Sequence, residues 1–159
     1  MNIKNKIIFL FLLFLGINCS SPIQQTADSI EGSYSKNDLQ KIKWIEGMWK
    51  GLDGETPFYE IYKIINDTTL MITSYDWNGT DSSNTSYDYV QWKEDAYYLG
   101  KNQNYKTVSM SEREIKMIPI KASNDITWRL VDSNSWEAIL AGKKATKKYH
   151  MQRFDPFTK

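Results

Sequence analysis

From Met48 to the C-terminus, short runs rich in Tyr, Trp, Ile, Val and Thr alternate with short polar clusters of Asn, Asp, Gly and Ser. Aromatic and β-branched residues favour strands, whereas the residues of the polar clusters favour turns. The pattern therefore predicts ten strands, which we place at 48–52, 57–65, 69–77, 85–93, 96–99, 105–110, 114–120, 125–131, 135–141 and 146–154.

Most connections between these strands are short, so consecutive strands are expected to be antiparallel neighbours. A long meander of this kind exposes two sheet edges unless it closes on itself, and closure into a barrel removes both edges. We therefore expect an all-β fold, an up-and-down antiparallel β-barrel of about 8–10 strands.

Alternation along the strands indicates what the barrel encloses. Ile126 and Trp128 share one face, opposite Thr127 and Arg129. Elsewhere both faces are mixed, as at 87–92, where Tyr and Gln alternate with Asp, Val and Trp. Mixed faces favour a partly polar, aromatic-lined cavity over a solid core. They are also compatible with an oligomer that covers part of the outer face.

One short helix is predicted ahead of the strands. Leu39, Ile42 and Ile45 recur at a three-residue spacing, which places them on one face of a helix. Asn37 or Asp38 can provide its N-terminal cap, because short polar side chains accept hydrogen bonds from the first turn.

The N-terminus has the pattern of a targeting segment. Lys4 and Lys6 precede the unbroken apolar run 7–17. A membrane-spanning helix needs about 20 residues. The shorter run is typical of a signal peptide, which we place at 1–18.

The position of Cys19 resembles the lipobox of bacterial lipoproteins, in which such a cysteine takes a diacylglycerol on its sulfur and becomes the N-terminus. The sequence departs from that family at Gly16 and Asn18, where Leu and a small residue, respectively, are usual. The resemblance implies a lipid anchor on a membrane of the bacterial cell envelope, at the outer membrane or the periplasmic face. Ordinary cleavage, or an uncleaved anchor with Cys19 as a free thiol, are the alternatives. The lipidated cysteine and a polar, Ser-rich flexible tether would occupy 19–36.

The remainder is one domain by length, which we place at 37–159. The chain carries 20 basic residues, two of them before the apolar run, against 19 acidic ones. This balance excludes a strongly basic nucleic-acid binder. The single cysteine excludes a disulfide framework and a four-cysteine metal site. The 6 Trp and 10 Tyr, with only 4 Pro, exclude a disordered chain.

The stretch 39–49 resembles the opening of the lipocalins and the wider calycin superfamily, in which a short helix leads into a Gly-x-Trp on the first strand, here Gly47 and Trp49. With the Phe-Tyr-Glu of 58–60, it is similar to a family of uncharacterised lipocalin-like bacterial proteins. The resemblance implies that Arg153, on the last strand, packs across Trp49 and closes the barrel floor. It implies a ligand-binding barrel and no established reaction.

One segment departs from that narrower family. Its members carry an Asn-Pro-x-His-Asp-Phe-Pro segment before the eighth strand. The corresponding stretch here, 118–126, keeps Pro119 and Asp125 but has no histidine. A function tied to that histidine is therefore not implied.

Little in the sequence points to catalysis. His150 is the only histidine, and its polar strand neighbours indicate a surface position rather than a catalytic or haem-ligating one. The segment 76–81 lacks the residue order of an EF-hand and is interpreted as a solvated hairpin loop. Four carboxylates could supply a hydrolytic pair by chance: Glu46, Glu55, Glu60 and Asp88. An enzyme is therefore unsupported, and we expect no cofactor and no metal site.

The candidate ligand-binding residues are Tyr62, Tyr89, Gln91, Tyr98 and Arg129. Tyrosine offers flat apolar area and one hydrogen bond, which suits an amphipathic ligand, although these tyrosines could equally fill the barrel. Arg129 would hold a carboxylate or phosphate head group if its face of the strand points inward, and is an ordinary surface residue if it points outward.

The resulting hypothesis is a non-enzymatic, lipid-anchored envelope barrel that binds a small apolar or amphipathic molecule. The alternative is a structural or protein-interaction module with a filled barrel. An open internal volume lined by Tyr and Trp would favour the first hypothesis, and a plugged interior with an exposed aromatic patch the second.

Overall fold

The computed structural model describes residues 34–53 and 55–157. They lie in the second of the two units into which the chain divides, Met1–Ile30 and Glu31–Lys159. The predicted signal peptide, Cys19 and most of the predicted tether fall outside the described residues, so those predictions stay open. The described elements are one short helix and ten strands: η1 (Asp38–Ile45), β1 (Gly47–Asp53), β2 (Thr56–Asn66), β3 (Thr69–Trp77), β4 (Ser82–Lys93), β5 (Ala96–Leu99), β6 (Tyr105–Met110), β7 (Glu114–Pro119), β8 (Asn124–Asp132), β9 (Ser135–Gly142) and β10 (Thr146–Arg153).

The ten strands form a closed antiparallel barrel in which each strand pairs with its neighbours in sequence. The first and last strands close it through the pairs Trp49–Arg153 and Lys50–Gln152. Closure pairs the two backbone edges that an open meander would leave exposed. The predicted fold class is confirmed, and most predicted strands begin and end within two residues of the observed ones.

The β3–β4 connection differs most from the prediction. We expected a polar loop through Asn84, but β4 begins at Ser82, and Ser82 and Ser83 pair with Trp77 and Asp76. Strand pairing uses backbone groups, so serines can extend a ladder that their side chains do not predict. Asn84 has a positive φ of 50°, and the pairing register shifts nearby, so this hairpin contains a bulge.

The predicted helix is a 3-10 helix with a kink at Ile42, where φ is −99° and ψ is 19°. In a 3-10 helix, side chains three residues apart lie directly above one another, which suits Leu39, Ile42 and Ile45. All three are completely buried. Asn37 makes no side-chain cap. The Asp38 carboxylate instead accepts the backbone N–H of Ser35, which lies before the helix, at 2.7 Å. Among the described residues no helix has the length and apolarity to cross a bilayer.

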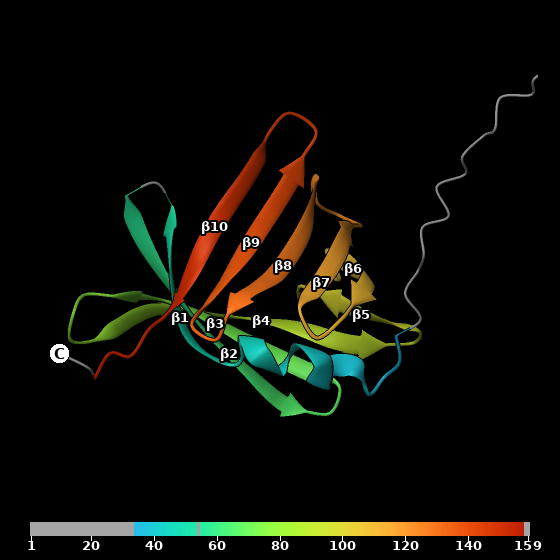
Figure 1. Ribbon diagram of the computed structural model, residues 1–159, viewed down its shortest axis with the longest axis horizontal. Helices are drawn as coiled ribbons and strands as arrows, with labels where there is room; N and C mark the ends of the chain where they lie inside the picture. Colours follow the sequence, from blue (N-terminus) through green and yellow to red (C-terminus); the bar gives the residue numbers. More distant parts are fainter. Residues whose placement is uncertain (1–33, 54, 158–159) are drawn as a thin grey trace, which may run out of the picture. The chain divides into compact units, whose positions relative to one another are not determined.

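The packed core fills the end of the barrel that η1 covers, which is the lower end in Figure 1. The buried face of η1 meets side chains from strands all around the barrel, among them Trp49, Leu70, Val90, Tyr97 and Ile115. The β1–β2 and β9–β10 hairpins extend away from η1, at the other end (Figure 1). One end of the barrel is therefore packed solid, and any internal space lies toward these hairpins.

Candidate functional site

The floor of the barrel is organised around Trp49 and Arg153. The Arg153 Cζ lies 3.9 Å from the centroid of the Trp49 ring. The guanidinium also donates to two carbonyl oxygens at the C-terminal end of η1, those of Trp44, at 3.2 Å, and of Glu46. The contact that the lipocalin resemblance implied is present, and it joins the last strand to the first strand and to the helix.

Gly47 makes room for this arrangement. Its φ is +122°, a conformation that residues with a Cβ rarely adopt, and a Cβ at this position would collide with the Arg153 guanidinium. Trp49 is fixed from its other side, because its indole N–H donates to the Ile45 carbonyl oxygen at 2.6 Å. The floor is thus a rigid base beneath the open part of the barrel.

Above the floor lies a cavity of about 670 Å³. Its rim includes exposed residues of the hairpins, such as Asp53, Thr56 and Asp76, so the cavity opens to solvent at that end. The side chains deeper inside come from β2, β3, β4, β5, β8, β9 and β10: Phe58, Glu60, Tyr62, Ile72, Ser74, Asp88, Leu99, Trp128, Trp136, Ala138, Leu140, Tyr149 and Met151.

Three aromatic rings form the deep wall of the cavity. Tyr62 meets Trp128 edge to face at 5.6 Å between ring centroids, and it meets Trp136 in the same way at 5.5 Å. Trp128 and Trp136 are 5.8 Å apart. Nearer the rim, Phe58 and Tyr149 form a further edge-to-face pair at 5.3 Å. Such pairs hold one another's orientation, so the apolar surface is formed in advance of any ligand.

Glu60 is the central polar group of the cavity. The Tyr62 hydroxyl donates to its Oε2 at 2.7 Å, and the Ser74 hydroxyl donates to its Oε1 at 3.2 Å. Burial raises the pKa of Glu60 above its ordinary value, and these two hydrogen bonds only partly oppose that rise. Burial and the nearby carboxylate raise the pKa of Tyr62 well above 10, so Tyr62 keeps its proton and remains a donor.

The other charged side chains that line the cavity are also acidic. Asp76 accepts a hydrogen bond from the Asn84 amide at 2.7 Å, and Asp88 projects from β4. Asp53, at the rim, pairs with Lys147 at 2.6 Å. Within the described part of the chain, Glu60, Asp76 and Asp88 form no ion pair with a lysine, arginine or histidine. Nowhere in the described part of the chain do His, Cys, Asp and Glu side chains form a cluster suited to a metal ion.

Only one of the predicted ligand-binding residues, Tyr62, lines this cavity. Tyr89, Gln91 and Tyr98 do not, and this corrects the prediction. Successive strand residues point to opposite faces. On β4, Asp88 lines the cavity, so its neighbour Tyr89 and the equivalent Gln91 belong to the outer face. Tyr98 pairs with Gln91 across β4 and β5, so it shares that outer face.

Arg129 also lies outside the cavity. Its Nε donates to the Glu114 carboxylate at 2.8 Å, and both side chains are solvent-accessible. Trp128, its neighbour, lines the cavity, so alternation places Arg129 on the outer face. The inward orientation, which would have let Arg129 hold an anionic head group, is therefore wrong.

Several cavity residues were not among the predicted ligand-binding residues. Trp128 lies on the apolar face that alternation identified, and Trp136 and Ala138 alternate with the polar Glu137 in the same way, so the strand pattern contained a signal for them. Glu60 and Asp88 were considered only as chance members of a hydrolytic pair, and the fold brings both to the cavity.

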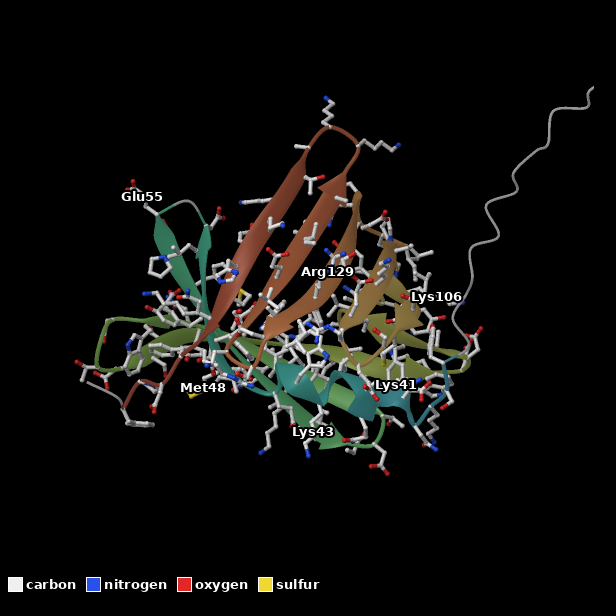
Figure 2. The ribbon with its side chains drawn as sticks, in the orientation of Figure 1. Lys41, Lys43, Met48, Glu55, Lys106 and Arg129 are labelled. Atoms are coloured by element: carbon white, nitrogen blue, oxygen red, sulfur yellow. The ribbon has the colours of Figure 1, made fainter. Side chains whose placement is uncertain are left out.

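Glu46, Glu55 and His150 lie outside this site. Glu46 accepts the Ile64 backbone N–H at 2.8 Å, which ties the end of η1 to β2. Glu55 is exposed at the tip of the β1–β2 hairpin (Figure 2). His150 is exposed on β10, as its polar neighbours predicted.

Comparison with known proteins adds little to this geometry. No family model and no curated protein matches the chain. A redesigned β-barrel is among the solved structures that it resembles, with 12% sequence identity over 72% of this chain and 96% of that one and a TM-score of 0.38. The lipocalin resemblance of the sequence therefore stays a prediction.

Proposed function

We propose that this barrel binds a small apolar or amphipathic molecule in its cavity and catalyses no reaction on it. The observation that carries the proposal is the open, aromatic-lined cavity above the packed floor. Its volume of about 670 Å³ falls among those of small-molecule sites, which lie at roughly 300–1,000 Å³. A barrel serving only as a structural module would have its whole interior filled.

The chemistry of the walls supports an amphipathic ligand. Trp128, Trp136 and Tyr62 offer a continuous apolar surface at depth, and the carboxylates offer a few fixed polar contacts. Mostly apolar walls with a small number of placed polar groups are typical of ligand sites. The walls are strand side chains in a closed barrel, so little ordering entropy has to be lost on binding.

We further propose that the barrel is held at a membrane of the bacterial envelope by a lipid on Cys19, with 20–36 as the tether. This part rests on the sequence alone. An anchored barrel would meet amphipathic molecules where they concentrate, at the membrane surface.

Tryptophan fluorescence can test the proposed binding, because two tryptophans line the cavity. Titration with a panel of fatty acids, isoprenoids, amines and aromatic metabolites should shift or quench the emission saturably, with dissociation constants in the micromolar range, or about −8 kcal/mol. A filled cavity should abolish the signal, so Ala138→Phe, inside the cavity, should not bind. Ala141→Phe, exposed on the same strand, is the matched control and should bind as the parent does.

Leu140→Trp, nearer the rim, provides a second blocking variant if Ala138→Phe does not fold. Melting curves identify the variants that fold. If a folded blocking variant still binds saturably, the ligand binds outside the cavity. No saturable binder in the panel would end the proposal.

The interaction-module alternative is favoured by a different feature. A shallow groove of about 420 Å³ on the outer face is lined by Tyr75, Trp77 and Pro156, with Phe157 largely exposed beside it. The test is a photo-crosslinker at Phe157, with one at the exposed Ile65 on β2 as control. The interaction function would be favoured if the crosslinker at Phe157, and not the one at Ile65, captures one defined envelope protein and no small molecule of the panel binds.

A further inference from the structure

The cavity carries a strong imbalance of charge. Its lining includes Asp53, Glu60, Asp76 and Asp88, and no lysine, arginine or histidine. Lys147 stands at the rim, where its ammonium lies 4.9 Å from the Tyr149 ring centroid. It is already paired with Asp53 at 2.6 Å, so it does not offset the charges of Glu60, Asp76 and Asp88.

Glu60 is the acid for which this imbalance matters most. Each of its carboxylate oxygens accepts one hydroxyl hydrogen, from Tyr62 or Ser74, which leaves acceptor positions free. These hydroxyls are neutral donors, so they satisfy lone pairs but leave the charge uncompensated. A desolvated carboxylate without a cation is costly, and a cation brought into the cavity would relieve that cost.

A second acid approaches from the same side of the barrel. Glu60 pairs with Ser74 across β2 and β3, and Asp88 pairs with Ile72 across β4 and β3. The two acids thus stand on strands separated only by β3, with backbones about 12 Å apart, two strand spacings across the sheet and two residues along it. Both side chains line the cavity above the β3 wall, so a single positive group can lie within reach of both.

The aromatic walls also favour a positively charged group on the ligand. The face of an aromatic ring is electrostatically negative and attracts ammonium groups, most strongly when water is excluded. Tyr62, Trp128 and Trp136 enclose the deep part of the cavity, and Phe58 and Tyr149 stand near its rim. Rings and carboxylates that converge on one space would repel an anionic head group and attract a cationic one.

From these features we infer that the cavity selects a small amphipathic cation, an ammonium head on an apolar body, with Glu60 and Asp88 as its anchors. This inference rests on the proposed function and names its ligand class. It replaces the anionic head group that an inward Arg129 would have held, because Arg129 is on the outer face. The apolar body would lie against the Trp128 and Trp136 rings.

Three probes of equal chain length test the charge preference on the purified full chain: octylammonium, 1-octanol and octanoate. Tryptophan emission and calorimetry at neutral pH give the dissociation constant of each. We expect octylammonium to bind at least about tenfold more tightly than 1-octanol, a difference of about 1.4 kcal/mol, with octanoate the weakest.

Substitutions then assign the preference to its residues. Glu60→Gln and Asp88→Asn keep the size of each side chain and remove its charge. Each should weaken octylammonium binding about tenfold, the loss of one charge-assisted contact, while 1-octanol binding stays within about twofold. Glu112→Gln is the matched control, since Glu112 is exposed in the β6–β7 turn and is not part of the cavity lining. It should leave all three affinities unchanged.

The outcomes separate this inference from the function on which it rests. Equal binding of the three probes, or tightest binding of octanoate, would overturn the cation inference and leave a ligand-binding barrel. An octylammonium preference that persists in both folded acid variants would overturn the role of Glu60 and Asp88. Failure of all three probes, and of the wider panel, would overturn the binding function itself.

Discussion

Replacing Trp49 with alanine would test whether the barrel floor supports the fold as its contacts indicate. Trp49 is completely buried, and its ring contacts the Arg153 guanidinium at 3.9 Å and Trp136 edge to face at 6.1 Å. Its N–H donates to the Ile45 carbonyl oxygen at 2.6 Å, and that oxygen would lose its partner. The substitution therefore removes packing, a cation–π contact and a buried hydrogen bond together.

The magnitude follows mainly from the packing. Truncating a buried tryptophan to alanine costs about 3–5 kcal/mol. The cation–π contact adds about 0.5–2 kcal/mol, and these contributions overlap, so we expect Trp49→Ala to lose about 4–5 kcal/mol. At about 3–5 °C per kcal/mol for a domain of this size, the melting temperature should fall by roughly 15 °C.

Trp77→Ala is the matched control. Trp77 is half-buried on the outer face and has one ring contact, with Phe154 at 6.0 Å. Its removal should cost only about 1–2 kcal/mol, in the ordinary range for a substitution without a large cavity. Urea unfolding followed by circular dichroism gives both free energies of unfolding, and thermal melts provide a second measure. Equal losses for the two variants would refute the role assigned to the Trp49–Arg153 floor.

Three further predictions concern the floor, the cavity and the anchor. Gly47→Ala should destabilise the protein by about 2 kcal/mol or more, because it adds backbone strain and displaces Arg153, whereas Gly79→Ala, at φ +101° with open space around it, should show the strain alone; equal urea midpoints would contradict this. Glu60→Gln should stabilise the protein at pH 7, because a folded pKa raised above 4.5 means that the ionised group opposes folding. That gain should shrink as the pH falls through the raised pKa toward 4.5 and below, and a pH-independent gain in urea unfolding would argue against a buried charge. Cys19→Ser should move the protein from the membrane to the soluble fraction. Unchanged fractionation, without incorporation of labelled fatty acid, would refute the prediction that Cys19 is lipidated.

The strand order and the closed barrel were predictable because they depend on local signals. Turn residues separate the strands at short intervals, and short turns leave consecutive strands little choice but to pair. The extension of β4 to Ser82 was missed because its side chains resemble a loop, whereas the pairing involves its backbone. The kinked 3-10 form of η1 was also missed, although the spacing of its buried residues was recognised.

The sequence predicted a partly polar, aromatic-lined cavity, but it did not predict which residues line it. The period of two along a strand determines which residues share a face, and not which face is inside. On β8 the apolar face of Ile126 and Trp128 favoured the inward side, and both are buried. On β4 neither face is purely apolar, so Tyr89 and Gln91 were wrongly placed in the site.

By itself, the sequence predicted the ten-strand meander, and its lipocalin resemblance implied the contact between Trp49 and Arg153. The signal peptide at 1–18, followed by Cys19, stays a prediction. Only the tertiary structure decided that the charged side chains lining the cavity are acidic. The pairing of β2, β3 and β4 brings Glu60 and Asp88 to one wall of the cavity, and the pairing of β7 with β8 places Arg129 against Glu114 on the outer face. Charge in a site depends on which side chains share an enclosed space, and that is set by register and closure rather than by composition.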